Sequence, residues 1–142
     1  VQDFLMNDKC SAGTGKFLEI MANRLGVTLQ ELFDMAEAGT VLPISSLCTV
    51  FAESEVINYI GEGRSREDIA AGVVDSVAAK VAQLAQRKNL AGRIILTGGL
   101  SHSGYFTKIL SEKIGQTVEP TEQGRYAGAL GAALLAREKN KK

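Results

Sequence analysis

The sequence predicts a helix-rich α/β domain with a short parallel sheet, and three features support this prediction. Several segments repeat apolar residues every three or four positions, which is the period of an amphipathic helix. The apolar, β-branched run 93–97 stops at Gly98 and Gly99 and is typical of a buried parallel strand. One helix separates it from a second short run, 117–119, so the two strands form a βαβ unit. Because so few strands make a poor sheet alone, we expect their edges to meet other strands or a second copy of the chain.

The expected helices have start and stop signals. Gly26 ends the first helix, and Thr28 with Glu31 forms a capping-box pattern that opens the second. Ser65 and Asp68 form a similar pattern before the longest helix. In chain order we expect the end of a strand over 1–6, helices over 14–25, 28–39, 48–60 and 65–88, the strand 93–97, a helix over 103–114, the strand 117–119 and a last helix over 126–139.

The strand 93–97 is apolar throughout its centre, so it requires cover on both faces. Two helical segments, 69–84 and 128–136, are apolar enough to supply that cover. The second of them is rich in glycine and alanine, which gives it a thin face for close packing. We therefore expect the strand to lie in the interior, between these two helices.

Length and composition limit the kinds of protein this chain can be. Residues 1–142 fit a single domain, and 45% hydrophobic with 23% charged residues is typical of a globular protein. The formal net charge is zero, so we expect no nucleic-acid partner. No apolar run reaches the roughly 18–20 residues that span a membrane, and no signal peptide opens the sequence. Two cysteines without a leader predict the reducing environment of the cytoplasm.

The two cysteines each stand before a predicted helix. Cys10 precedes Gly13, Thr14 and Gly15, where backbone N–H groups can approach a bulky anion, and Cys48 precedes the third helix. Both settings favour thiolate over thiol. An iron–sulfur cluster needs about four thiolates, so a cluster would be shared by two copies of this chain. From the residues alone, buried or unpaired thiols remain the alternative.

Three other patterns carry weaker functional signals. The glycine-rich segment after Cys10 is not a phosphate-binding P-loop, because Cys10 and Phe17 stand where glycine and serine or threonine are required. Glu53 and Glu55 are two positions apart and point to different helix faces, so they remain candidates for nucleotide or cluster contacts rather than an acid–base pair. His102 is the single histidine of the sequence, and its position favours a loop residue over a ligand or base.

Four segments of the sequence resemble the ATP-dependent activators of 2-hydroxyacyl-CoA dehydratases and the related ATPase subunits of benzoyl-CoA reductases. These segments, 6–15, 44–57, 97–100 and 128–134, keep the order and roughly the spacing of that family. The resemblance implies the helix-rich, C-terminal half of an actin-like (ribonuclease H-like) ATPase fold, in the superfamily of actin, sugar kinases and heat-shock chaperones. Residues 1–142 would then be the cluster-binding and adenosine-side region.

The resemblance also implies ligands and partners. In that family two cysteines of each subunit hold one [4Fe-4S] cluster at a homodimer interface, which implies cluster ligation by Cys10 and Cys48. Gly98, Gly99 and Leu100 resemble the superfamily's adenosine-binding motif, which implies contact with a nucleotide. The family's nucleotide is ATP or ADP with magnesium, and its binding would be weak or absent in this fragment. An electron would enter from a ferredoxin or flavodoxin and leave for a 2-hydroxyacyl-CoA dehydratase or a benzoyl-CoA reductase-type component.

One part of the superfamily's ATP site does not occur in this sequence. Each half of such an ATPase opens with an Asp/Gly-rich β-hairpin that holds phosphates and magnesium, and no Asp-x-Gly pattern is present. We therefore predict the cluster-bearing part of an ATP-dependent electron-transfer activator, incomplete for hydrolysis and uncertain as an enzyme. Two alternatives stay open: a non-catalytic dimerisation or scaffold fragment, and a nucleotide-binding subunit completed by a separate chain.

Overall fold

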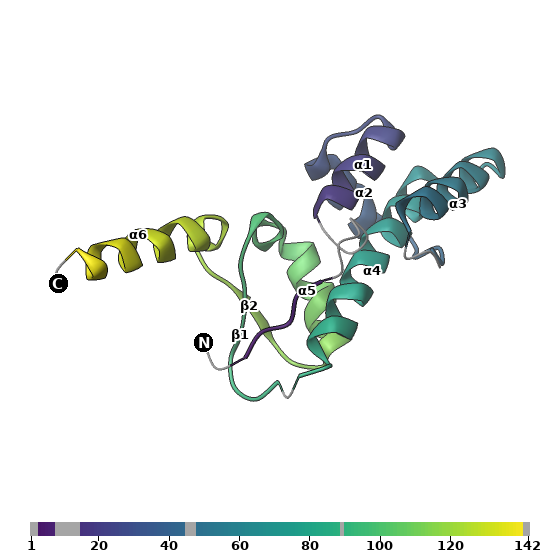
Figure 1. Cartoon of the computed structure of the whole chain (residues 1–142). Helices are drawn as coiled ribbons and strands as arrows, with labels where there is room; N and C mark the ends of the chain where they lie inside the picture. The colour runs from purple at the N-terminus through teal and green to yellow at the C-terminus, as the bar shows by residue number, and fades with distance from the viewer. Residues whose placement is uncertain (1–2, 8–14, 45–47, 89, 141–142) are drawn as a thin grey trace.

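Helices dominate the structure, a computed structural model that describes residues 3–7, 15–44, 48–88 and 90–140 (Figure 1). The described elements are α1 (Gly15–Leu25), α2 (Leu29–Ala38), α3 (Thr49–Gly61), α4 (Arg66–Ala85), β1 (Ile94–Leu96), the 3₁₀ turn η1 (Gly99–His102), α5 (Gly104–Ile114), β2 (Val118–Pro120), the 3₁₀ turn η2 (Gly124–Tyr126) and α6 (Ala127–Lys139). This order agrees with the sequence prediction, except that residues 3–7 belong to no strand.

The helix α4 is the centre of the fold, and α2 and α5 pack against it. Its residues Ile69, Val73 and Val77 are buried, as their spacing of four predicts. Leu18 from α1 and Phe106 from α5 complete the same core. Full burial of each such side chain stabilises the folded state by roughly 1.5–3 kcal/mol. The core of the described structure therefore lies between helices rather than on a sheet.

The predicted helix starts at Thr28 and Ser65 are confirmed. The Thr28 hydroxyl accepts a hydrogen bond from the Glu31 N–H at 3.2 Å, and the Glu31 carboxylate accepts one from the Thr28 N–H at 2.7 Å. The bond from the Thr28 N–H to the Glu31 carboxylate, and after it the bond from the Thr28 hydroxyl to the same carboxylate, lower the pKa of Glu31 from its ordinary value. Ser65 accepts a hydrogen bond from the Asp68 N–H at 3.1 Å and opens α4 in the same way. Both caps satisfy backbone N–H groups that a helix start leaves without partners.

The two strands β1 and β2 pair in parallel, with Ile94 opposite Val118 and Leu96 opposite Pro120. The connection between them is α5, so the βαβ unit is present. Val118 is buried against the helical core, whereas Ile95 is 41% exposed. The sheet is therefore covered on one face, and the expectation of an interior strand covered on both faces is wrong for this chain.

The reason is the course of α6, which leaves η2 and extends away from the other helices (Figure 1). None of its residues is buried, and Leu130, Leu134 and Leu135 are all exposed. The apolar composition of α6 indicates that this helix is normally covered by other protein. Composition does not specify which surface covers it, and in this chain none of its residues is buried. None of the described helices, α6 included, is long and apolar enough to cross a membrane.

Candidate functional site

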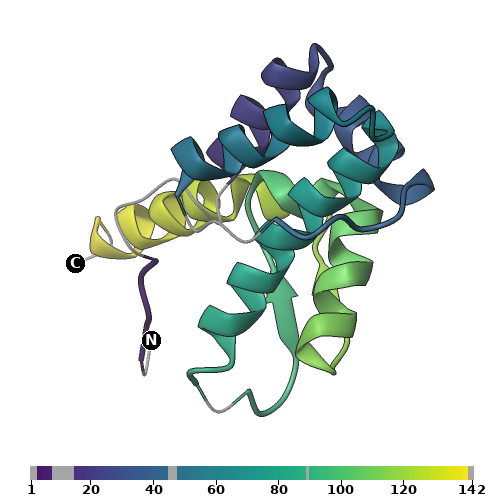
Figure 2. The ribbon, with the colours of Figure 1, turned by 90° about the vertical axis from the view of Figure 1, so that its right-hand side faces the viewer.

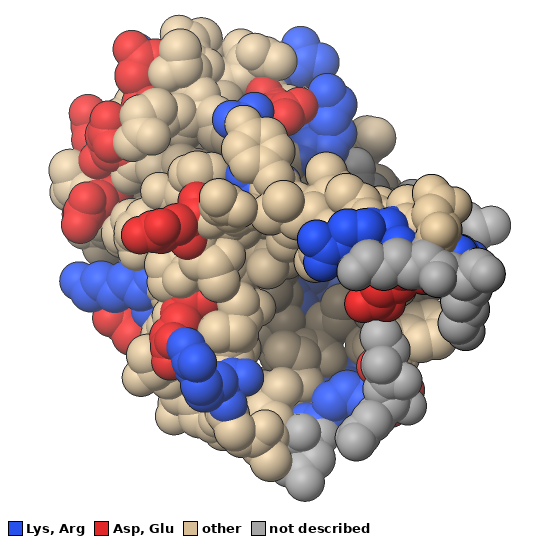
Figure 3. Space-filling model, turned by 90° about the vertical axis from the view of Figure 1, so that its left-hand side faces the viewer, with Lys and Arg blue, Asp and Glu red and all other residues tan. Residues whose placement is uncertain are grey.

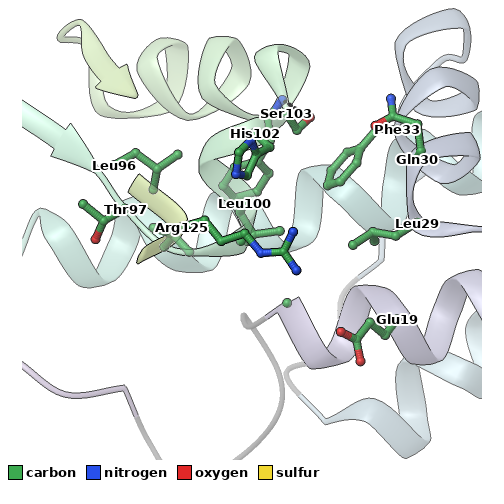
Figure 4. Close-up of a pocket in the computed structure, with 14 residues that line it drawn as sticks. Glu19, Leu29, Gln30, Phe33, Leu96, Thr97, Leu100, His102, Ser103 and Arg125 are labelled. Carbon is green, nitrogen blue, oxygen red and sulfur yellow. Dashed lines mark hydrogen bonds between the residues drawn. The ribbon is translucent and has the colours of Figure 1, made fainter. Parts of the chain in front are cut away.

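A pocket of about 700 Å³ opens beyond the carboxyl end of β1 (Figure 4). Crevices at this end of parallel strands are the usual ligand sites of α/β folds. The lining comes from both halves of the chain: Gly15, Glu19, Leu29, Gln30, Phe33, Val81, Leu96, Thr97, Gly99, Leu100, His102, Ser103, Phe106 and Arg125. The predicted site residues Gly15, Gly99 and Leu100 thus meet in one cavity.

The turn after β1 depends on glycine at a single position. Gly98 has φ 91°, a backbone conformation that side chains disfavour, and its N–H donates to the Gly124 carbonyl oxygen at 2.8 Å. The Ser101 hydroxyl donates back to the Gly98 carbonyl oxygen at 2.7 Å. Gly98 therefore shapes the turn without lining the pocket. A Cβ atom built at the next residue, Gly99, would meet no heavy atom within 4 Å, so the chain leaves open space beside the Gly99 backbone.

The floor of the pocket is apolar. Leu29 and Phe33 come from α2, and Leu100 and Phe106 come from the segment after β1. The rings of Phe33 and Phe106 meet edge to face, with centroids 6.4 Å apart. Aromatic and aliphatic side chains in this arrangement suit the burial of a flat, largely apolar ring.

Polar side chains from four elements surround this floor. Glu19 comes from α1, Gln30 from α2, His102 from η1 and Arg125 from η2. In Figure 4 the Arg125 side chain reaches toward the middle of the pocket, and Glu19 stands at its lower edge. A carboxylate accepts hydrogen bonds from hydroxyl groups, and a guanidinium stacks on flat rings or pairs with anions. The set fits a ligand that combines a flat ring with hydroxyl and phosphate groups.

Charges of both signs share the surface on the side of the molecule that α6 points toward. On the face shown in Figure 3, basic and acidic side chains are interspersed, and a hollow opens in the lower centre. This mixture agrees with the formal net charge of zero.

The second candidate site is the N-terminal end of α3, where Cys48 is the N-cap residue. Cys48 is partly buried, and its carbonyl oxygen accepts the Ala52 N–H at 3.0 Å. Because a helix start carries a partial positive charge, this position fits a thiolate ligand of an anionic group. The predicted site residues Cys10, Gly13 and Thr14 lie outside the described residues. Among the residues that the structure describes, no group of three or more His, Cys, Asp or Glu side chains could hold a metal ion.

The two acidic candidates on α3 do not line the pocket. Glu53 pairs with Arg24 of α1, with Oε1 and Nε 2.7 Å apart. Glu53 thus connects the helix after Cys48 with the helix that begins at Gly15. No sequence signal pointed to this pair, because its members lie far apart in the chain.

Most of the polar pocket residues were also missed by sequence reasoning. Glu19, Gln30 and Arg125 belong to no motif, and His102 was assigned to a loop without a binding role. They share a site only because α1, α2 and the two 3₁₀ turns meet there. Two signals pointed toward this end of β1: the turn at Gly98 and Gly99 after a predicted parallel strand, and the resemblance to the activator family.

The helix-rich fold with a pocket beyond a parallel strand belongs to the α/β class, and the comparisons identify it as the actin-like kind. Residues 1–136 match the BadF/BadG/BcrA/BcrD ATPase family, and the chain belongs to it. It is 44% identical over 138 residues to the (R)-2-hydroxyglutaryl-CoA dehydratase activating ATPase of Acidaminococcus fermentans, covering 96% of this chain and 53% of that protein. It is also 44% identical over 139 residues to the activator of lactoyl-CoA dehydratase of Anaerotignum propionicum, covering 97% and 54%.

Solved structures give the same result. The activator of the 2-hydroxyisocaproyl-CoA dehydratase from Clostridium difficile, with bound ADPNP, superposes with a TM-score of 0.91 at 39% identity, covering 99% of this chain and 53% of that one. Component A of the Acidaminococcus fermentans (R)-2-hydroxyglutaryl-CoA dehydratase gives 0.92 at 43% identity, covering 100% and 55%. The chain therefore spans about half the length of the relatives it matches.

Proposed function

We propose that this chain is the cluster-bearing, nucleotide-binding part of an ATP-dependent activator that passes electrons to a 2-hydroxyacyl-CoA dehydratase or a related reductase. The observation that carries the proposal is the pairing of two features in one chain of this family. A pocket with an apolar floor and polar rim opens at the end of β1, and Cys48 stands at the start of α3. The first suits a nucleotide, and the second suits a thiolate ligand.

The nucleotide role assigns parts of the pocket to parts of the ligand. The adenine ring would lie on the floor formed by Leu29, Phe33 and Leu100, with Arg125 above or beside it. Glu19 would accept hydrogen bonds from the ribose hydroxyls. The open space beside Gly99 would let the ligand approach the backbone closely. This chain supplies neither phosphate hairpin, so the phosphates and their magnesium would be held mainly by another domain or chain.

The cluster role places one [4Fe-4S] cluster between two copies of the chain, held by Cys10 and Cys48 of each. The surface of α3 supports a homodimer there. Val50 and Phe51, directly after Cys48, are 67% and 66% exposed, and Ile57 lies further along the same helix in the open. Exposed apolar residues of this size mark an association surface. When bound, such a cluster would accept one electron from a ferredoxin or flavodoxin and hand it to the partner enzyme.

One alternative has its own supporting observation. The helix α6 is apolar around its whole circumference from Ala127 to Ala136, and none of its residues is buried in this chain. A helix of that composition is normally covered by other protein. This favours a nucleotide-binding unit that another domain, or a separate chain, completes. The other alternative is a dimerisation or scaffold fragment without turnover, which would bind neither the nucleotide nor the cluster.

The deciding experiment is the iron and sulfide content of anaerobically purified chain. We expect about two irons per chain, from one four-iron cluster per pair of chains. Cys10→Ser and Cys48→Ser should each remove most of the iron. Full iron content in both variants would overturn the cluster assignment, and a colourless monomer that binds no nucleotide would favour the scaffold alternative.

A further inference from the structure

We propose that residues 40–44 form a strap across α4 that fixes the position of Cys48, with Gly72 and Tyr59 as its positioning residues. The strap connects the end of α2 with the segment that leads to Cys48, and Figure 2 shows it in blue, crossing the teal helix α4. The proposal rests on the proposed function, because the position of Cys48 matters through its role as a ligand.

The first end of the strap is tied to the start of α4. The Thr40 N–H donates a hydrogen bond to Asp68 Oδ1 at 2.7 Å. Just before it, Gly39 lies against the α4 backbone, where a Cβ atom would overlap the Glu67 carbonyl oxygen. Only glycine fits so close an approach, so the point where the chain leaves α2 is fixed against α4.

The middle of the strap crosses α4 at Gly72. A Cβ atom on Gly72 would overlap the Leu42 carbonyl oxygen. Glycine is unfavourable inside a helix, and Gly72 stands in the interior of α4 among fully buried residues. The close contact with the Leu42 carbonyl oxygen explains why glycine stands at this position of the helix. The side chains of Leu42 and Ile44 pack on the core at the same crossing.

The last end of the strap is held by the helix that follows Cys48. The Tyr59 hydroxyl donates a hydrogen bond to the Pro43 carbonyl oxygen at 2.7 Å. Tyr59 lies in α3, so this bond closes a loop in the chain, and Cys48 is inside that loop. Only Ala52 and Val56 of α3 are buried, and Glu53 pairs with Arg24 of α1, so the Tyr59 bond is the contact that ties α3 directly to the strap.

The strap is not packed along its whole length. A groove of about 470 Å³ runs beside it, lined by the strap residues and by Asp75, Ser76 and Lys80 of α4. Among the residues that the structure describes, none fills this groove beside the strap. Besides the packing of Leu42 and Ile44 on the core, the position of the strap depends on the ties at Asp68, Gly72 and Tyr59. A change at any of these ties should move the segment that carries Cys48.

The test measures the position of Cys48 without requiring a cluster. In the full chain with Cys10→Ser, Cys48 is the one thiol, and its rate of alkylation reports how accessible it is. Tyr59→Phe removes a single hydroxyl and should raise that rate about two- to tenfold, the range that one hydrogen bond produces in a local opening equilibrium. Tyr126→Phe is the matched control, because Tyr126 is 60% exposed on η2 and should leave the rate unchanged.

Gly72→Ala tests the crossing itself and should raise the alkylation rate further, by lifting the strap. Its control is Gly128→Ala in α6, where a Cβ atom meets nothing within 4 Å. If Gly72→Ala fails to fold, Tyr59→Phe alone decides. In anaerobic protein with both cysteines, Tyr59→Phe should also lower the iron content or shift the reduction potential, which a purely structural hydrogen bond would leave unchanged.

A folded Tyr59→Phe variant with the unchanged alkylation rate and iron content would overturn the strap proposal. The outcome is distinguishable from failure of the proposed function. If Cys48→Ser keeps its iron, the cluster assignment fails whatever Tyr59→Phe does. If Cys48→Ser loses iron while Tyr59→Phe changes nothing, only the strap proposal fails.

Discussion

Arg24 and Glu53 join α1 to α3 through an ion pair of 2.7 Å between Nε and Oε1. The helix α1 lines the pocket with Gly15 and Glu19, and α3 begins directly after Cys48. The pair is therefore a direct connection between the pocket wall and the cysteine helix. Its side chains are 58% and 26% exposed, so solvent weakens its contribution to stability.

A double-mutant cycle should measure this connection. We expect Arg24→Gln or Glu53→Gln to lower the free energy of unfolding by at most about 1 kcal/mol, since exposed pairs contribute little. Urea unfolding of the single and double variants gives the coupling energy. The charge-reversed pair, Arg24→Glu with Glu53→Arg, should recover part of it. Lys16→Gln is the control, because Lys16 pairs with Glu19 within the same helix. A coupling energy of zero between Arg24 and Glu53 would show that this pair does not hold α1 and α3 together.

The isolated chain should hydrolyse ATP slowly or not at all. The sequence contains no Asp-x-Gly phosphate hairpin, so it lacks the groups that place magnesium and stabilise transferred phosphate. Phosphate release by purified chain, compared with a complete relative such as the Acidaminococcus fermentans ATPase, measures this. The prediction would be contradicted if the chain hydrolysed ATP as fast as the relative and if this rate stayed the same after further purification.

Stability should fall in acid partly because of Asp68. The Thr40 N–H, and after it Ser65, hold the pKa of Asp68 below its ordinary value of 3.8. A carboxyl with a lowered folded-state pKa stabilises the fold fully above its unfolded value and loses that contribution as pH falls through the folded value. Asp68→Asn should therefore destabilise the chain near neutral pH and flatten the acid side of its stability profile. Urea unfolding across about pH 3 to about pH 6 tests this.

Asp34→Asn is the control for that experiment, because Asp34 lies on the exposed surface of α2. If Asp34→Asn and Asp68→Asn change the acid side of the stability profile equally, the bond between Asp68 and the strap makes no specific contribution to the free energy of unfolding.

Exposed leucines on α6 should matter for association rather than for folding. Leu134 and Leu135 are 51% and 62% exposed, so replacing both with lysine removes little buried area from this chain. We expect an unchanged free energy of unfolding and weaker self-association in sedimentation. A loss of several kcal/mol would instead mean that α6 packs on the helical core in solution.

Local signals predicted the fold well, and long-range arrangement explains what they missed. The capping pattern at Thr28, the buried face of α4 and the βαβ unit each depend on residues close in sequence, and all three are present. The course of α6 depends on which surface covers it, and an apolar helix does not specify that surface. The pocket residues Glu19 and Arg125 come from opposite ends of the chain, so no spacing could group them.

Gly99→Val should block nucleotide binding while leaving the fold intact. Gly99 lines the pocket at the start of η1, and a Cβ atom there meets nothing within 4 Å, so the valine side chain would occupy the ligand's space rather than strike protein. The neighbouring Gly98 has φ 91° and would be strained by any side chain, which makes it unsuitable for this test. Gly61→Val, at the open end of α3, is the control.

Titration with a fluorescent ATP analogue should detect binding to the unaltered chain and to Gly61→Val but not to Gly99→Val. Circular dichroism should show nearly the same helix content in all three, because Gly99 lies outside the α-helices and Gly61 is the last residue of α3. The unaltered affinity should be weak, since this chain holds the base and ribose side of the pocket without the phosphate hairpins. A folded Gly99→Val variant that binds the analogue as tightly as the unaltered chain would place the nucleotide somewhere other than this pocket.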